Sequence, residues 1–209
     1  MNTYDDSILY NEKLVKDLIY PFLHKKVIFP SSSKQFKFAA VMITIHFTNS
    51  NPHVILIKRT NFVKNHASEI SFPGGNFIEN DVEMLETAVR EFNEEIGIKI
   101  RRKQVVGCLD TERTLTSRYI IYPYVALIDR MPEITSTNYE VEKIIDAPLI
   151  PLLKTRENDL MHQKQYSIPN LPKFTYKNEI IWGATARILD QLAKLFSREI
   201  NYSKVKTDN

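Results

Sequence analysis

Three glutamates stand close together near the middle of the chain: Glu91, Glu94 and Glu95. Glu91 and Glu95 are four residues apart, so a helix would stack their carboxylates on one face, with Glu94 one step around it. Like charges at this spacing repel by about 0.2–0.5 kcal/mol per pair on a free helix. Carboxylate oxygens are the ligands that Mg²⁺ and Mn²⁺ prefer, and the preceding pair Gly74-Gly75 lets backbone carbonyls approach the same point. The first hypothesis is therefore a divalent metal site made by the three glutamates and a carbonyl of Gly74 or Gly75.

The surrounding residues predict a helix from Asp81 to Ile96, a stretch without proline or glycine. Asn80 or Asp81 can cap its start, with Glu83 placed for a capping box, and Gly97 ends it. The alternative is a solvated acidic helix face, which the glutamate spacing alone would favour. The metal site is favoured by the neighbouring residues, which are the glycine pair upstream, the Arg90-Glu91 pair and Gly97 at the end of the helix. The apolar residues fall on one narrow stripe of this helix: Leu85, Ala88, Val89, Phe92 and Ile96.

One stretch of this chain resembles a family signature, the Nudix box. The stretch consists of Gly75, then a loop, then Arg90-Glu91-Phe92-x-Glu94-Glu95-x-Gly97-Ile98. That family hydrolyses nucleoside diphosphates linked to another moiety. The segment between Gly-Gly and Arg-Glu is one residue longer here than in the commonest form, so Asp81 meets the box's earlier acidic position if the extra residue lies in the loop. The resemblance implies an α/β/α sandwich with a mixed β-sheet and a Mg²⁺ or Mn²⁺ cofactor. It implies catalytic or metal-binding roles for Glu91, Glu94 and Glu95, with Arg90 orienting the carboxylates.

The residues before the box narrow the substrate. Residues 55–75 resemble the extra signature of the coenzyme A diphosphatase branch of the Nudix family, and the spacing fits without gaps. Arg59 and Phe-Pro-Gly-Gly match, whereas Lys64 stands where arginine is usual and Ser68 where glycine is. Lys64 keeps the charge but loses the bidentate fork that suits phosphate, and Ser68 loses backbone freedom if the branch needs a positive φ there. Thr60 and Ile57 also depart from the signature.

Coenzyme A carries a 3′-phosphate as well as a pyrophosphate, so a basic loop beside the metal suits such an anion. Arg59, Lys64 and His66 are therefore the predicted substrate-binding residues, together with Phe72 of the Phe-Pro-Gly-Gly run. The alternative is a basic surface loop in which Phe72 only caps the core.

The branch resemblance continues into the second half of the chain. By that match Glu140 begins a short helix near the active site and is the candidate for an additional catalytic carboxylate. The alternative is that Glu140 and Glu142 merely charge a helix N-terminus favourably. Residues 154–172 are polar and predict a surface loop that shapes the substrate pocket, with His162 exposed to solvent.

Two further histidines lie on predicted strands that pair through a turn at residues 49–52: His46 and His53. They are interpreted as strand-face residues, because neither has a partner at the spacing of a metal site. Near the C-terminus, Phe174–Tyr176 and Ile180–Trp182 predict a hairpin, and Gly183 opens the last helix.

The whole chain of 209 residues suits one α/β domain. We expect an N-terminal helical extension over residues 1–36, a Nudix domain over 37–196 and a flexible tail over 197–209. The net charge is +3 with mixed signs along the chain, which gives no argument for nucleic acid. No apolar run approaches the roughly 20 residues of a membrane helix, and the N-terminus does not resemble a signal peptide. With Cys108 as the only cysteine, we expect a cytoplasmic protein without membrane contact; a homodimer is compatible with the sequence.

The predicted function is metal-dependent hydrolysis of the pyrophosphate bond of coenzyme A or acyl-CoA. The products would be 3′-phospho-AMP and 4′-phosphopantetheine or its acylated form. Two alternatives remain: a Nudix hydrolase of another substrate, such as ADP-ribose, NADH or a dinucleoside polyphosphate, and a Nudix-fold sensor that binds nucleotides without turnover.

Overall fold

The computed structural model describes residues 12–24, 35–61, 68–131, 134 and 138–197. The helices, with two short 3-10 turns, are α1 (Glu12–Ile19), η1 (Tyr20–Phe22), α2 (Met84–Ile96), η2 (Arg102–Gln104), α3 (Leu149–Lys154), α4 (Leu160–Tyr166) and α5 (Gly183–Leu195). The strands are β1 (Lys37–Thr48), β2 (Asn51–Arg59), β3 (Ile70–Ser71), β4 (Gly74–Asn76), β5 (Val105–Cys108), β6 (Glu112–Arg113), β7 (Tyr119–Ile128), β8 (Val141–Pro148), β9 (Glu157–Asn158), β10 (Pro172–Tyr176) and β11 (Glu179–Ile181).

A mixed sheet forms the centre of the molecule. Its main path is β3-β2-β1-β7-β5, with β4 on β1, β6 on β7 and β8 on β2. Strand β1 is antiparallel to β2 and parallel to β7. The β1–β2 hairpin turns through Asn49 and Ser50, whose φ angles of 49° and 63° suit the tight two-residue turn that fixes strand register. The mixed sheet expected from the Nudix resemblance is confirmed.

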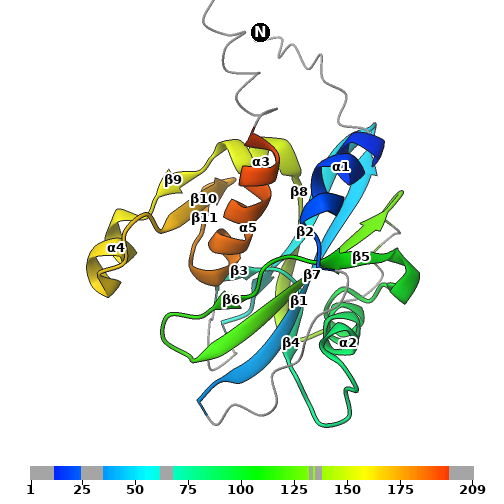
Figure 1. Ribbon diagram of the computed structural model, residues 1–209, viewed down its shortest axis with the longest axis horizontal. Coiled ribbons are helices and arrows are strands. Elements are labelled where there is room, and N and C mark those ends of the chain that lie inside the picture. Colours follow the sequence, from blue (N-terminus) through cyan, green and yellow to red (C-terminus); the bar gives the residue numbers. More distant parts are fainter. Residues whose placement is uncertain (1–11, 25–34, 62–67, 132–133, 135–137, 198–209) are drawn as a thin grey trace, which may run out of the picture.

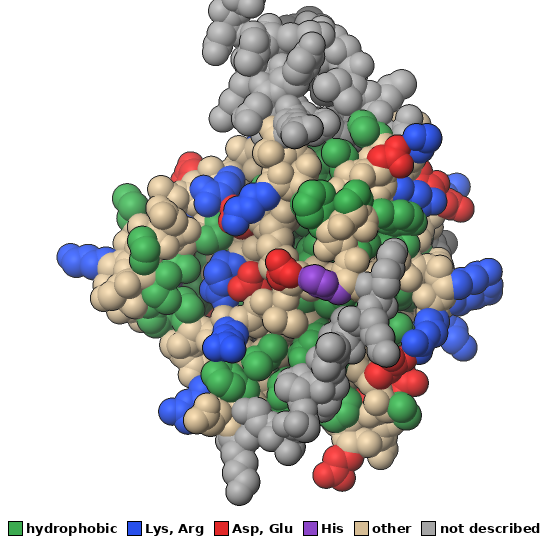
Figure 2. Space-filling model, in the orientation of Figure 1, with side chains coloured by type: hydrophobic (Ala, Val, Ile, Leu, Met, Phe, Trp, Pro, Cys, Tyr) green, Lys and Arg blue, Asp and Glu red, His purple; other side chains and the backbone are tan. Residues whose placement is uncertain are grey.

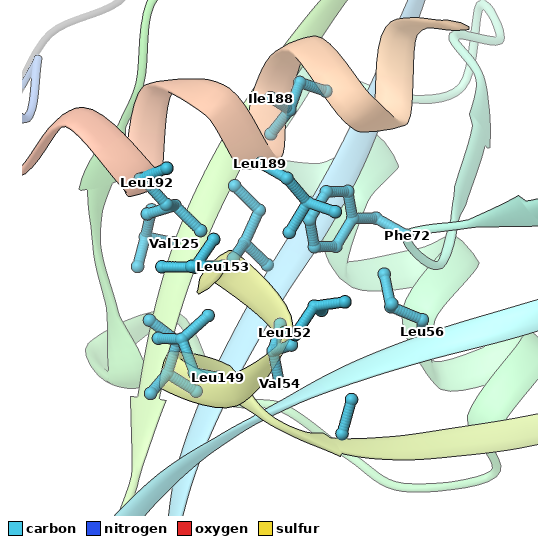
Figure 3. Close-up of a cluster of buried hydrophobic side chains, with 14 of the residues drawn as sticks. Val54, Leu56, Phe72, Val125, Leu149, Leu152, Leu153, Ile188, Leu189 and Leu192 are labelled. Carbon is cyan, nitrogen blue, oxygen red and sulfur yellow. The ribbon is translucent and has the colours of Figure 1, made fainter. Parts of the chain in front are cut away.

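Helices cover both faces of this sheet (Figure 1). Helix α2 packs on one face, where Ala88, Phe92 and Ile96 join a buried cluster with side chains of β1, β2 and β7. The other face is covered by α1, α3 and α5, whose apolar side chains form the second cluster. Figure 3 shows Leu152 of α3 and Leu189 of α5 within this second cluster. The α/β/α sandwich is therefore confirmed.

Strands β1 and β2 separate beyond their hairpin, and the segment 70–76 lies between them. On one side of this gap β3 pairs with β2, and on the other β4 pairs with β1. The amide of Met42 donates to the carbonyl of Pro73 at 2.8 Å, which ties the segment to β1. This insertion carries the glycine pair to the centre of the sheet, next to α2.

Helix α2 begins at Met84, so the predicted start at Asp81 is wrong. The N-cap residue is Glu83, and no side chain caps this end, so the capping box predicted for Asn80 and Glu83 is wrong too. Asp81 does not cap the helix, because its carboxylate is bound to Arg90 and Thr87 instead. The predicted end is confirmed, because Gly97 takes a left-handed φ of 74° and its amide donates to the carbonyl of Asn93.

The surface loop predicted over residues 154–172 is also wrong. That stretch contains the end of α3, β9 and α4. By contrast, the predicted final hairpin is confirmed as β10 and β11, with Phe174 opposite Ile181. Helix α5 begins at Gly183 as predicted.

The surface shown in Figure 2 carries acidic and basic side chains interspersed with apolar ones. This agrees with the mixed charge seen along the sequence. Within the part of the chain that the structure describes, no helix is both long and apolar enough to cross a membrane.

Candidate active site

Gly75 lies directly against the carboxylate of Glu91. A Cβ atom built on Gly75 would lie 2.5 Å from the carboxyl carbon of Glu91, a distance that real atoms do not tolerate. Helix α2 supplies the carboxylate, and the segment 70–76 supplies a glycine backbone without a side chain. The sequence analysis expected a carbonyl of the glycine pair near the glutamates, and the structure brings the Gly75 backbone against the Glu91 carboxylate.

Glu95 is the most buried of the glutamates, with only 2% of its surface exposed. Its Oε2 accepts the amide of Gly74 at 2.8 Å, and its Oε1 accepts from Nη1 of Arg59 at 3.3 Å. Burial raises the pKa of Glu95 to about 7, although the Gly74 amide and the Arg59 guanidinium act to lower it. Burial likewise raises the pKa of Glu91, against the opposing effect of Arg90. Cation binding would relieve both shifts, because it favours ionised carboxylates.

Arg90 links Asp81, which precedes α2, to the carboxylate of Glu91 on the helix. Its Nε and Nη2 donate to the two carboxylate oxygens of Asp81 at 3.1 and 3.0 Å, and its Nη1 donates to Glu91 at 2.7 Å. Nη2 also donates to the backbone carbonyl of Asn76 at 3.1 Å. Four anchors thus fix one guanidinium, which in turn holds the Glu91 carboxylate in place.

Asp81 was not among the predicted site residues. It is buried, and it also accepts the hydroxyl of Thr87 at 2.7 Å. Burial acts to raise its pKa, but the bonds from Arg90 and Thr87 outweigh this effect and leave the pKa lowered. The signal that could have found it was the earlier acidic position of the Nudix box, which Asp81 meets.

Glu94 is the most exposed of the three glutamates. Its side chain is 56% exposed and lies 3.6 Å from Nη1 of Arg90. The carboxylates nearest the glycine pair are those of Glu91 and Glu95. A metal-binding or catalytic role for Glu94 therefore stays a prediction.

Glu140 reaches the same cluster from the turn before β8. Its Oε2 accepts from Nη2 of Arg59 at 2.7 Å, so Arg59 lies between Glu95 and Glu140. The predicted helix at Glu140 is wrong: the residue lies in a turn that leads into β8, because residues 141–148 pair with β2. Glu142 lies within β8, near Lys58, and no helix N-terminus is present for it to charge.

A cavity of about 1040 Å³ opens beside these residues. Its floor includes Arg59, Gly74 and Gly75, and its walls come from the β6–β7 connection, from α4 and from the start of α5. Aromatic side chains contribute to the lining, among them Tyr166 and Trp182. The cavity therefore joins the carboxylate cluster to a larger, partly aromatic surface.

Two residues at this wall or directly behind it were not predicted as site residues. Trp182 was predicted only as part of the final hairpin, but it is partly buried and lines the cavity. His162 was expected to be exposed in a loop, but it lies in α4, is mostly buried and stacks on the Trp182 ring at 4.2 Å. The signal that pointed to this region was the polar stretch 154–172, which was expected to shape the substrate pocket.

Of the remaining predicted substrate-binding residues, the structure describes Phe72 only. Phe72 is buried in the core cluster with Leu56 and Leu189, and it also lines the cavity (Figure 3). Its direct contact with substrate stays a prediction. Lys64 and His66 lie outside the described residues.

The site fits a hard divalent cation such as Mg²⁺ or Mn²⁺. Its donors are carboxylate oxygens on one helix face, and a backbone without Cβ leaves space against one of them. Two of these carboxylates, Glu91 and Glu95, are held close together in a region where burial disfavours their negative charge. A cation would compensate this charge, and the residues that would hold it are Glu91, Glu95 and a carbonyl of the glycine pair.

Comparison with known proteins agrees with this geometry. The family model of the NUDIX domain matches residues 37–166. An uncharacterized Nudix hydrolase NudL of Photorhabdus laumondii is 31% identical over 157 residues, which cover 75% of this chain and 83% of the relative. The NudL of Pectobacterium atrosepticum is 30% identical over 74% of this chain and 80% of the relative. The chain belongs to the Nudix family, and it is a Nudix hydrolase.

A solved structure supports the fold. The MutT/nudix family protein from Enterococcus faecalis superposes with a TM-score of 0.56, covering 96% of this chain and 75% of that chain, at 14% identity. At this identity the likeness concerns the fold alone.

Proposed function

We propose that this Nudix hydrolase cleaves the pyrophosphate bond of coenzyme A or acyl-CoA to 3′-phospho-AMP and 4′-phosphopantetheine or its acylated form. The observation that carries the proposal is the position of Arg59. This arginine matches the signature of the coenzyme A diphosphatase branch, and it lies between Glu95 and Glu140 on the floor of the cavity. A guanidinium at this point can bind a phosphate beside a metal held by the carboxylates.

The residues that line the cavity suit a large anionic ligand. Three basic side chains, Lys37, Arg59 and Arg187, line the cavity together with two acidic ones, Glu69 and Glu140. The volume of about 1040 Å³ is at the upper end of the range for small-molecule sites, roughly 300–1000 Å³. Aromatic rings along its wall suit stacking of a base such as adenine. A nucleotide with a long second moiety fits these properties better than a short one.

The departure at Ser68 does not argue against the branch. Ser68 adopts a φ of 60°, the left-handed conformation for which the branch signature supplies glycine. The chain thus keeps the backbone path while replacing the residue. The amide of Ser68 donates to the carbonyl of Arg59 at 3.2 Å, which closes the loop at its base.

The chemistry is divided between the cation and the chain. A bound Mg²⁺ or Mn²⁺ would neutralise charge on the phosphoryl oxygens and lower the pKa of an attacking water. Arg59 would orient the pyrophosphate, and Arg90 keeps Glu91 in position through the bond to its carboxylate. Glu140 borders the cavity and is therefore the candidate for the general base.

The test is metal-dependent turnover of a substrate panel: coenzyme A, 3′-dephospho-coenzyme A, NADH and ADP-ribose. The variant Glu95→Gln removes the buried carboxylate, and Glu79→Gln is the matched control, since Glu79 is exposed in the loop before α2. We expect coenzyme A to have the highest kcat/KM, with Glu95→Gln inactive and Glu79→Gln unchanged.

The other outcomes separate the alternatives. Faster turnover of ADP-ribose or NADH would overturn the coenzyme A proposal and keep the Nudix chemistry. Equal turnover of coenzyme A and its dephospho form would show that the 3′-phosphate is not recognised. Tight nucleotide binding without turnover of any substrate would favour the sensor.

A further inference from the structure

Two histidines and an aspartate meet on the α2 face of the sheet, outside the active site. His46 of β1 lies directly opposite His53 of β2. Strand β8 pairs along the other edge of β2, where Asp146 lies opposite Ile55, two residues from His53. Residues at i and i+2 share a face of a strand, so all three side chains project to the same side. The pairing of three strands therefore brings together residues that are 100 positions apart in sequence.

The three side chains point at one another. Nε2 of His46 and Nδ1 of His53 each lie 2.9 Å from Oδ1 of Asp146. One ligand atom from each residue lies within 4.8 Å of the other two. The ring centroids of the histidines are 5.3 Å apart. The expectation that neither histidine has a partner at metal-site spacing is wrong, because the third member comes from a distant strand.

The burial of the cluster is graded from one side to the other. His46 is 2% exposed, the His53 side chain 17% and the Asp146 side chain 48%. A small solute can therefore reach the cluster from the side of Asp146, while His46 closes it from behind. Nδ1 of His46 is buried without a hydrogen-bond partner among the described residues. The only polar contact that the structure describes for this imidazole is with Asp146.

Two imidazole nitrogens and a carboxylate oxygen are a donor set for borderline transition-metal ions. Zn²⁺ binds histidine nitrogen and carboxylate oxygen at about 2.0–2.2 Å, so tetrahedral donors lie about 3.3 Å apart. The two separations of 2.9 Å need to open by only a few tenths of an ångström to reach that spacing.

We propose that His46, His53 and Asp146 form a second divalent-metal site, which takes Zn²⁺ or a similar transition-metal ion with water in the fourth position. The site is separate from the carboxylate cluster. Val41 of β1 pairs with Gly74, and His46 lies five residues further along the strand, about 16 Å away. The two sites also differ in chemistry, since the active site offers oxygen donors that suit Mg²⁺ and the second site offers imidazoles.

A metal at this point would join β8 to the β1–β2 hairpin. All three ligands are on strands of the central sheet, and the hairpin turn at Asn49-Ser50 sets the register that places His46 opposite His53. Because the ion binds only the folded arrangement, it would raise the midpoint of thermal unfolding. The competing explanation is that Asp146 only accepts hydrogen bonds from the two rings, without any metal.

The experiment is titration of the metal-free full chain with Co²⁺ and Zn²⁺ in excess Mg²⁺. Excess Mg²⁺ competes for the oxygen ligands of the active site but not for imidazole nitrogens. Tetrahedral Co²⁺ gives visible absorption bands that octahedral Co²⁺ at oxygen ligands gives only weakly. The variants are His53→Gln and Asp146→Asn. The matched control is His24→Gln, which removes an exposed histidine that also lies 2.7 Å from an aspartate oxygen, on Asp110.

We expect one equivalent of Co²⁺ with tetrahedral bands in the wild type and in His24→Gln, and displacement of this ion by Zn²⁺. We expect at least a tenfold weaker affinity in both site variants. Unchanged binding in His53→Gln and Asp146→Asn would overturn the proposal, as would the absence of tetrahedral bands in the wild type. If one site variant fails to fold in circular dichroism, the other decides, and a Zn²⁺-dependent rise in the unfolding midpoint of the wild type serves as the second readout. A midpoint that Zn²⁺ leaves unchanged would mean a hydrogen-bonded cluster only.

Discussion

Asp81 and Arg90 form a two-point pair, in which Nε and Nη2 of the guanidinium donate to the two carboxylate oxygens at 3.1 and 3.0 Å. The aspartate lies before α2 and the arginine within it. Because Arg90 also donates to Glu91, Asp81 acts on the Glu91 carboxylate through one intermediate side chain. The pair therefore gives the loop before the helix a part in positioning the site.

The variant Asp81→Asn removes the charge of this pair and keeps its size. We expect a loss of about 1–3 kcal/mol in the free energy of unfolding, since an amide cannot accept both donors of Arg90. We also expect kcat to fall about 10- to 100-fold with little change in KM, because Glu91 loses its fixed position. Steady-state kinetics and urea unfolding, with Glu79→Gln as control, give both numbers. A lower stability with unchanged kcat would limit Asp81 to a structural role.

The pKa of Glu95 makes the stability of the metal-free protein depend on pH. The pKa is raised from 4.5 in a model compound to about 7 in the folded protein, so the folded state holds the proton more tightly than the unfolded chain. The stabilising contribution of protonated Glu95 is therefore complete below pH 4.5 and is lost as pH rises to 7. We expect the free energy of unfolding to fall by about 1–3 kcal/mol over this window in the presence of a chelator.

The variant Glu95→Gln provides the comparison. We expect it to lack most of this slope and to be more stable than the wild type at pH 8 without metal, although it is inactive. Addition of Mg²⁺ should stabilise the wild type more than the variant, because the cation favours the ionised carboxylate. An equal slope in both proteins would show that Glu95 titrates normally.

The two glycines of the pair should respond differently to alanine. A Cβ on Gly74 would lie 2.3 Å from the carbonyl oxygen of Ala40 and 2.6 Å from Cα of Val41, and neither backbone atom can move easily. We expect Gly74→Ala to destabilise the fold by about 3 kcal/mol or more. The atoms nearest to a Cβ on Gly75 would be those of the Glu91 carboxylate, the end of a flexible side chain.

We therefore expect Gly75→Ala to keep its stability within about 1 kcal/mol and to lose metal-dependent activity, since Glu91 must turn away. Thermal unfolding and Mg²⁺ titration of activity measure the two effects separately. Equal destabilisation by both substitutions would show that a Cβ beside the Glu91 carboxylate disturbs the fold as much as one beside the backbone of β1.

Trp182 should affect substrate binding more than the chemical step. The ring lines the cavity and stacks on His162 with an interplanar angle of 3°. We expect Trp182→Leu to raise KM for coenzyme A about 5- to 50-fold with a small effect on kcat, the range of one lost base-stacking contact. Trp182→Phe keeps an aromatic ring and should recover most of the affinity. A fall in kcat at unchanged KM would place Trp182 outside the substrate contacts.

The sequence by itself determined the local parts of this protein. The spacing of Glu91 and Glu95 placed both carboxylates on one face of α2, because the helix repeat depends only on neighbouring residues. Gly97 ended the helix for the same kind of reason, through its left-handed φ. The Nudix resemblance of this stretch was enough to predict the sandwich and the class of enzyme.

The tertiary structure decided the contacts between distant residues. Arg59 meets Glu140 from 81 positions away, and His46 meets Asp146 from 100, because neighbouring strands bring them together in a register that no local pattern specifies. The helix that the family resemblance implied at Glu140 was wrong, because the residues that follow it pair with β2 as strand β8. Side-chain partners such as Asp81 depend on where a loop folds back onto a helix, and this is fixed by packing rather than by the residues of the loop alone.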